Sequence, residues 1–245
     1  MLHALPRAAA NADATMFVPL PTRRKARLRW VTPLLVALLL TAHLWVSTRS
    51  PAEGQALLQS WAALAGGTDL VRTLQLLVSD WRWLRLFTAL GLHADWPHVV
   101  GNVVFLLIFG LPAERIMGPW RFFLLFALGG AFANLAAILA VPGPERLVIG
   151  ASGAVSAVIG AYLPLFPGAK LGVVLPLGLF LEFVRAPASV FIGCWAVLQV
   201  VFAYIGPAFG EVAWVAHVGG FLFGAVFAML ARGGIARRLR RDRGF

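Results

Sequence analysis

Charged side chains are scarce in this sequence of 245 residues. Asp, Glu, Lys and Arg make up 13% of the chain, against roughly 25% in soluble proteins, and hydrophobic residues make up 60%. So few charges exclude one or two soluble globular domains of this length. Many apolar runs instead approach the roughly 20 residues that a helix needs to cross the hydrocarbon core of a bilayer. The composition therefore predicts a polytopic membrane protein.

Cysteine and acidic residues are also rare. The single cysteine, Cys194, excludes an intramolecular disulfide. Ten acidic residues against 21 basic ones leave a net charge of +11. The basic residues crowd at the chain ends, in "RRKARLR" (23–29) and "RRLRRDR" (237–243), rather than on a soluble domain, which excludes nucleic-acid binding. They are typical of cytoplasmic flanks that meet anionic lipid headgroups.

Six apolar runs divide the chain. We expect spans at about residues 30–46, 97–111, 120–141, 150–166, 188–205 and 212–230. The first run lacks a good cleavage site at its end, which favours an uncleaved span over a signal peptide. Segment 50–94 mixes apolar residues with Asp, Arg and Trp, as is typical of helices in the headgroup layer. The short run Leu171–Val184 contains Pro176 and is interpreted as an interfacial or half-buried connector.

The distribution of Lys and Arg predicts the orientation and the domain limits. Six spans place 16 of the 21 basic residues on the side of both termini, which makes that side cytoplasmic. We expect a basic tail at 1–29, whose residues 1–21 are disordered, a membrane domain at 30–232 and a second basic tail at 233–245. The expected location is the inner (cell) membrane of a bacterium.

Polar side chains recur near the outer ends of three predicted spans. His98 and Asn102 share one face of the second span, Ser152 lies about two residues into the fourth, and His217 lies about five residues into the sixth. Each has a simpler explanation, as a solvated end residue or as a packing or hydrogen-bonding group between helices. Their common depth and common side favour function, because polar groups in a bilayer are costly.

Small residues lie on the helix faces that carry Ser152 and His217. They let helix backbones approach closely, so we expect the fourth and sixth helices to bring these two side chains within hydrogen-bond distance. A helix seam alone would explain the glycines but not the histidine. A serine beside a histidine is a nucleophile beside its base. The small residues are Gly153, Ala157, Gly160, Gly220 and Gly224.

The sequence predicts a catalytic dyad rather than a triad. The nearest carboxylates, Glu145 and Glu211, fall in outer loops, and a buried carboxylate would be expensive in the membrane. "GASGA" (150–154) is not Gly-x-Ser-x-Gly, and no strand precedes it. This excludes the nucleophile elbow of the α/β-hydrolases.

Several motifs resemble those of the rhomboid family of intramembrane serine proteases, in the family's order. "HVVGN" (98–102) resembles its His-x-x-x-Asn, "GASG" (150–153) its Gly-x-Ser-Gly, and "AHVGGFLFG" (216–224) its Ala-His-x-x-Gly-x-x-x-Gly. "WR" (81–82) resembles a pair in its first outer loop, and "ERIMG" (114–118) its cytoplasmic turn after the second span. The resemblance covers about Ser79 to Arg232. One departure is Ser156, where many members carry an aromatic residue that stacks on the base histidine.

The resemblance implies a role for each matched residue. Ser152 would be the nucleophile and His217 the base. The oxyanion and substrate-binding residues would be His98, Asn102, Gly150 and Gly153. No metal or other cofactor is expected.

The resemblance also implies an architecture and a substrate class. We expect a six-helix core with interfacial helices in the first outer loop and a water-filled cavity open to the outside. The enzyme would cleave single-span membrane proteins near their outer membrane boundary, at small residues in a helix that unwinds easily. Its partners would be these substrates and the lipid bilayer. Substrates would enter laterally, with the fifth helix as gate and the loop Gly206–Glu211 as cap.

Two other functions fit parts of the pattern. An inactive relative could bind transmembrane clients on the same fold, but the presence of both Ser152 and His217 argues against it. A small transporter would need inverted repeats or helices broken at the midplane. The sequence has no such repeat, and its polar groups lie near one face.

Overall fold

The computed structural model describes residues 29–65, 71, 75, 78, 81–140, 146–177, 180–205 and 214–243, so the expected disordered segment 1–21 lies outside them. The first half of the chain contains α1 (Val31–Ser47), α2 (Pro51–Trp61), β1 (Ala63–Ala65), η1 (Arg82–Leu84), α4 (Arg85–Thr88), η2 (Ala89–Gly91), α5 (Trp96–Phe105), the π-helical η3 (Leu106–Gly110) and α6 (Leu111–Met117). The second half contains α7 (Pro119–Ala140), β2 (Arg146–Val148), α8 (Ser152–Leu165), β3 (Lys170–Leu177), β4 (Phe180–Pro187), α9 (Ala188–Ile205) and α10 (Trp214–Arg243).

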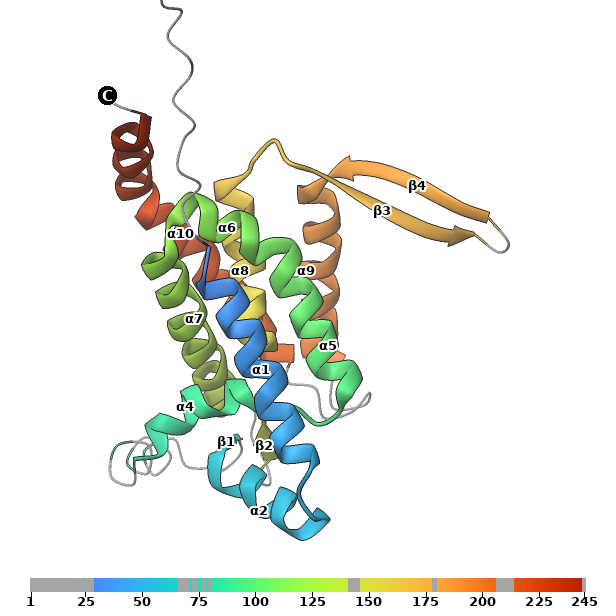
Figure 1. The fold of residues 1–245 in the computed structure, drawn as a ribbon, viewed down its shortest axis with the longest axis vertical. Coiled ribbons are helices and arrows are strands. Elements are labelled where there is room, and N and C mark those ends of the chain that lie inside the picture. The colour runs from blue at the N-terminus through green and yellow to red at the C-terminus, as the bar shows by residue number, and fades with distance from the viewer. Residues whose placement is uncertain are drawn as a thin grey trace, which may run out of the picture.

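Six apolar helices occupy the places where the sequence predicts membrane spans, and each begins within two residues of the expected position. Three of them are long and apolar enough to cross a membrane: Trp96–Met117, Pro119–Ala140 and Trp214–Arg240. The other three, α1, α8 and α9, are shorter apolar helices. The six run side by side as a bundle (Figure 1). The mostly helical membrane class is thus confirmed, while the number of six spans stays a prediction.

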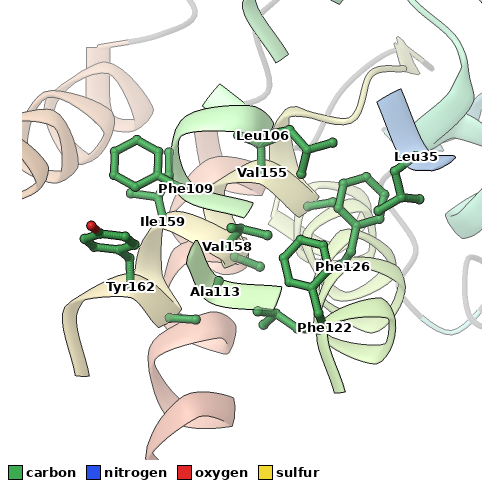
Figure 2. Packing of buried hydrophobic residues seen from close by; sticks show 14 of the residues in the cluster. Leu35, Leu106, Phe109, Ala113, Phe122, Phe126, Val155, Val158, Ile159 and Tyr162 are labelled. Carbon is green, nitrogen blue, oxygen red and sulfur yellow. The ribbon is translucent and has the colours of Figure 1, made fainter. Parts of the chain in front are cut away.

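Helix α8 forms the centre of the bundle. Every residue from Gly153 to Tyr162 is buried, so this helix is enclosed by others instead of facing lipid on one side. Figure 2 shows Val155, Val158 and Ile159 of α8 among aromatic and aliphatic side chains of neighbouring helices. Since lipid tails are as apolar as these side chains, close van der Waals packing holds such a core together. The packed centre fixes the position of Ser152, the first residue of α8.

Glycines set the distance between α8 and α10. A Cβ at Gly220 would overlap the carbonyl oxygen of Gly153, and one at Gly224 would overlap that of Ala157. A Cβ at Gly160 would in turn overlap the carbonyl oxygen of Phe221. The two backbones therefore touch directly, as the small-residue pattern predicts. Any larger side chain at these positions would push the two helices apart.

A buried carboxylate fixes the start of α1. Glu114 accepts hydrogen bonds of 2.9 to 3.0 Å from the backbone amides of Trp30, Val31 and Thr32, and one of 2.7 Å from the Thr32 hydroxyl. The first amides of a helix have no partner within the helix, and its positive end favours an anion. Glu114 therefore ties α6 to α1, and Gly118, at φ +87°, makes the following turn into α7.

Two helices continue past the ends that hydropathy predicts. The second run extends beyond 111 through η3 and α6 to Met117, because Glu114 finds its partners inside the protein. The last helix continues to Arg243, through the segment expected as a separate tail, because Ala, Leu and Arg are good helix formers. Arg238 donates a 2.9 Å hydrogen bond to the carbonyl oxygen of Ile116. The end of α10 thus rests on the turn between α6 and α7.

Two small sheets are added to the all-α class that the sequence predicts. The run expected as a connector forms an antiparallel hairpin of β3 and β4, with Lys170 opposite Pro187, which extends away from the bundle (Figure 1). Its β-branched and aromatic residues favour strands, and Pro176 disfavours a helix. The second sheet pairs β1 with β2 and lies at the end of the bundle where α2 and α4 lie (Figure 1). Because β2 (Arg146–Val148) lies just before "GASGA", the prediction that no strand precedes this motif is wrong; β2 forms by pairing with a strand that is distant in the sequence.

The segment before Ser152 is held at that same end. Ala63 pairs with Val148 in the small sheet, and the amide of Gly150 donates a 2.9 Å hydrogen bond to the carbonyl oxygen of Ala89 in η2. The segment between α1 and α5 and the start of α8 therefore form one connected structure. This connection fixes Ser152 at the end of the bundle where the small sheet lies.

Candidate active site

The side chains of Ser152 and His217 meet across the α8–α10 contact. Nε2 of His217 lies 2.9 Å from Oγ of Ser152, although the two residues are 65 positions apart. The glycines described above make this approach geometrically feasible, since they remove the side chains that would separate the helices. A hydroxyl at this distance from an imidazole nitrogen can transfer its proton to it.

The other side of the His217 ring contacts α9. Oε1 of Gln199 lies 2.7 Å from Nδ1 of His217, and only 7% of Gln199 is exposed. An amide oxygen accepts hydrogen bonds and cannot donate them. Nδ1 must therefore carry the proton, and Nε2 is left as the acceptor that faces Ser152.

An aromatic ring also contacts the imidazole. Trp214 meets His217 edge to face, with the ring centroids 5.6 Å apart and the planes at 88°. Trp214 in turn stacks on Phe202 of α9, at 4.7 Å. The histidine is thus held by its own helix and by α9.

Ser156 does not take part in this contact. Its hydroxyl donates a 2.7 Å hydrogen bond to the backbone carbonyl oxygen of Ser152, one turn earlier in α8. Such a bond to residue i−4 is a common way for a serine in a helix to satisfy its hydroxyl. Of the two serines in "GASGAVS", the structure directs only Ser152 toward the histidine.

His98 lies against the segment that leads to Ser152. A Cβ at Gly150 would come within 2.7 Å of both Cε1 and Nε2 of the His98 ring, and 3.9 Å from Nδ2 of Asn102. Gly150 also has φ +108°, a region that favours glycine. Glycine is needed here for two independent reasons, and it brings α5 next to the candidate nucleophile.

Gly153, which follows Ser152 in α8, lies where α8 packs against α7 and α10. A Cβ there would come within 2.5 Å of the Cβ of Ala133 in α7. The described contacts of Gly153 are therefore those of a packing residue. Its assignment to substrate binding stays a prediction.

A histidine that the sequence analysis missed links the two halves of the site. Nε2 of His93, in the loop before α5, accepts a 3.3 Å hydrogen bond from the backbone amide of Ala151 and lies 3.1 Å from Nδ2 of Asn102. The backbone N–H of Ala151 can only donate, so Nε2 of His93 must be the acceptor and carries no proton. Asn102 directs one of its two amide hydrogens to His93, and a second hydrogen remains on the same nitrogen.

His93 is suited to this role because it is neutral. The ring is 3% exposed, and burial lowers the pKa of His93 from 6.5 to about 4, with a smaller contribution from the charge of His98. At neutral pH the ring therefore stays an acceptor. The sequence offers little indication of this role, because His93 lies outside the predicted spans, where a polar side chain is not unusual.

The contact between Gln199 and His217 was also missed, although the sequence indicates it more clearly than it indicates His93. Gln199 is the only amide in the apolar helix Ala188–Ile205, and a polar side chain inside a bilayer requires a partner. The prediction of a dyad rested on the lack of a carboxylate near His217 and did not consider that an amide could contact its ring. The candidate cap, Gly206–Glu211, and the loop carboxylates Glu145 and Glu211 lie outside the described residues.

The start of α8 supplies a further donor. Ser152 is the first residue of this helix, and the first backbone amides of a helix have no partner within the helix. The helix dipole adds partial positive charge at this end. The start of α8 and the side chains of His98 and Asn102 from α5 thus lie beside the segment that leads to Ser152.

Comparison with known proteins identifies relatives of most of the bundle, with α1 outside the residues that the family model matches. The model of the Rhomboid domain matches residues 80–233. The Bacillus subtilis protein named "Putative rhomboid protease YdcA" is 32% identical over 126 residues, which cover 51% of this chain and 58% of that protein. Rhomboid-like protein 11, chloroplastic, of Arabidopsis thaliana is 32% identical over 152 residues, 60% of this chain and 52% of that protein.

A third relative is matched over a shorter length. Rhomboid protease GluP of Bacillus subtilis is 33% identical over 87 residues, 36% of this chain and 17% of that protein. The chain thus spans little more than half of the first two relatives and a sixth of the third.

Proposed function

Because this chain belongs to the rhomboid family, whose domain covers residues 80–233, we propose that it is an intramembrane serine endopeptidase with Ser152 as nucleophile and His217 as base. The observation that carries the proposal is the 2.9 Å contact between Oγ of Ser152 and Nε2 of His217. Two residues from separate helices come into this contact at the end of a bundle, and neither is fully buried.

The chemistry follows the usual course of acyl transfer by serine. Oγ of Ser152 attacks the scissile carbonyl carbon while its proton moves to Nε2 of His217. The protonated His217 then gives that proton to the leaving amine nitrogen as the peptide bond breaks, which leaves an acyl ester on Ser152. A water molecule, deprotonated by the same nitrogen, hydrolyses the ester and restores the serine.

The oxyanion of each tetrahedral intermediate needs donors in place before the reaction. We assign this role to the Ser152 amide and to the side chains of Asn102 and His98, with Gly150 giving the space that lets α5 approach. Asn102 and His98 lie one turn apart on the same helix and converge on the segment before Ser152.

The substrates we propose are single-span membrane proteins, cut near the outer boundary of the membrane. Helix α8 begins with Ser152, and the strand β2 that precedes it lies at the end of the bundle that carries α2 and α4 (Figure 1). Trp61, Trp81 and Trp83 are exposed, as in an aromatic belt at an interface. We further propose six spans, with both basic termini in the cytoplasm of a bacterium. The exposed apolar side chains of the helices would then face lipid.

Reconstitution in liposomes tests the proposal. The purified protein is mixed with a single-span reporter and, separately, with a small fluorophosphonate that labels activated serines. We expect cleavage of the reporter near its outer boundary and labelling at Ser152. Both should be lost in the variants Ser152→Ala and His217→Ala. Binding of the reporter without cleavage or labelling would instead favour an inactive relative that holds transmembrane clients.

A further inference from the structure

We propose that Gln199 is the positioning residue of His217, so that Ser152, His217 and Gln199 form a hydrogen-bonded chain whose third member is an amide. This inference rests on the proposed protease function and adds a residue to it. It starts from the contact between Oε1 of Gln199 and Nδ1 of His217, at 2.7 Å. The contact is shorter than the one between His217 and Ser152.

The first effect of this contact is to select the tautomer of the base. Nδ1–H of His217 donates to Gln199, which leaves the lone pair of Nε2 for the proton of Ser152. Without an acceptor at Nδ1, the ring could carry its proton on Nε2 instead. In that tautomer the histidine would donate to Ser152 and could not act as a base.

The second effect is to support the charge that forms during the reaction. When Nε2 of His217 takes the serine proton, the imidazole becomes a cation, and its Nδ1–H remains directed at the Gln199 carbonyl oxygen. No proton moves to Gln199. A carbonyl dipole in a buried site stabilises such a cation more than it would in water, and it avoids the cost of placing a carboxylate in the bilayer.

The surroundings of the ring indicate why an amide is needed here. The hydroxyl of Ser156 is directed to the helix backbone and does not touch the ring. Trp214 contacts the ring edge to face and does not determine which nitrogen carries the proton. Among the described contacts of His217, only Gln199 sets both the direction of the ring and its tautomer.

The test uses the reaction of the full-length protein with a small fluorophosphonate. This probe needs the Ser152–His217 pair but does not need a transmembrane helix to enter the bundle. We expect Gln199→Leu, which has a similar volume and no acceptor, to slow labelling of Ser152 about 10- to 100-fold, as the loss of an acceptor for a buried donor implies. For reporter cleavage, kcat should fall by a similar factor while KM changes little.

Two further variants separate positioning from packing. Gln199→Glu keeps an acceptor oxygen at the same reach. Its buried carboxyl group should lower the melting temperature, but the molecules that stay folded should label within about threefold of the wild type, because the acceptor is what matters. Trp195→Leu removes a ring that packs α9 against Phe221 of α10, with centroids 5.9 Å apart, and leaves Gln199 in place. It should lower the melting temperature without a comparable loss of labelling rate.

The outcomes distinguish this proposal from the protease proposal. If wild-type protein labels at Ser152 and Gln199→Leu labels equally fast, the role of Gln199 is overturned and the protease function stands. If Gln199→Leu and Trp195→Leu lose the same fraction of activity, or if the folded fraction of Gln199→Glu labels as slowly as Gln199→Leu, Gln199 only packs α9. If wild-type protein is neither labelled nor cleaves the reporter, both proposals fall.

Discussion

The hydroxyl of Ser156 donates a 2.7 Å hydrogen bond to the backbone carbonyl oxygen of Ser152, while the hydroxyl of Ser152 lies 2.9 Å from His217. The two serines of one helix turn therefore have different environments. Ser152→Ala should abolish cleavage of a single-span reporter. Ser156→Ala should keep cleavage within about threefold, because a bond to residue i−4 contributes little to a helix. Initial rates in proteoliposomes measure both effects.

Labelling provides the control for this pair. Ser156→Ala should still react with a fluorophosphonate at Ser152, as judged by mass spectrometry of the labelled peptide. Cleavage that persists in Ser152→Ala would contradict the assignment of the nucleophile.

A side chain at Gly150, two residues before the nucleophile, should lower both stability and turnover. Gly150 has φ +108°, and a Cβ would lie 2.7 Å from the His98 ring. We expect Gly150→Ala to cost about 1–3 kcal/mol in backbone strain alone and to lower turnover further by displacing His98. Unfolding in detergent and cleavage rates measure the two parts.

A glycine on the neighbouring helix is the matched control. Nothing lies within 4 Å of a Cβ at Gly101 of α5, so Gly101→Ala should leave stability and turnover unchanged or slightly raise stability, since Ala favours a helix more than Gly. Equal behaviour of the two variants would mean that the contact between Gly150 and His98 does not constrain the site.

The stability of the protein should fall on acidification through His93, which lies outside the membrane-spanning helices. Its pKa is about 4 when folded, against an ordinary 6.5. Between these values the unfolded chain binds a proton that the folded chain does not. The stability that the neutral ring contributes is therefore complete above pH 6.5 and is lost as the pH falls toward 4, by about 3 kcal/mol at most.

The variant His93→Gln tests this prediction. Its amide oxygen can still accept the hydrogen bond from Ala151, but it does not titrate. We expect the melting temperatures of wild type and variant to be close at pH 7.5 and to diverge as the pH approaches 4, with the wild type losing more. Parallel curves would show that another group causes the acid sensitivity.

The positions of the helices could be predicted from the sequence because hydropathy and helix starts are local properties. All six apolar helices begin within two residues of the expected places. Helix ends depend on contacts that are distant in the sequence. A charged residue such as Glu114 predicts the end of a span. Its hydrogen-bond partners at the start of α1, more than 80 residues away in the sequence, allow the helix to continue past it. The same holds for the basic end of α10, which rests on the turn after α6.

The site was predictable only in part, for a related reason. The close packing of α8 and α10 follows from the spacing of glycines within each helix, so the contact between Ser152 and His217 could be expected. Nothing in the spacing of one helix tells which residue of α9 faces His217. Gln199 could have been suspected as the one amide in an apolar helix, but its partner could not be identified without the packing angle between α9 and α10.

The donors from α5 should matter for turnover more than for stability. Attack by Ser152 converts a carbonyl oxygen to an oxyanion, and each preorganised donor removed elsewhere has cost about 10²-fold in turnover. We expect Asn102→Ala and His98→Ala each to lower kcat for reporter cleavage by about this factor. The double variant should lose less than the product of the two, because both donors serve one charge.

A buried asparagine away from the dyad separates this role from a structural one. Nδ2 of Asn134 in α7 donates a 2.8 Å hydrogen bond to the carbonyl oxygen of Leu86, so Asn134→Ala should lower the melting temperature while the folded molecules keep their turnover. Asn102→Ala should show the opposite pattern and retain part of the fluorophosphonate labelling at Ser152, since the nucleophile and its base are intact. If Asn102→Ala and His98→Ala instead destabilise the protein in detergent as Asn134→Ala does, the two side chains of α5 are hydrogen-bonding groups of the fold. The oxyanion would then have to be held by the backbone amide of Ser152.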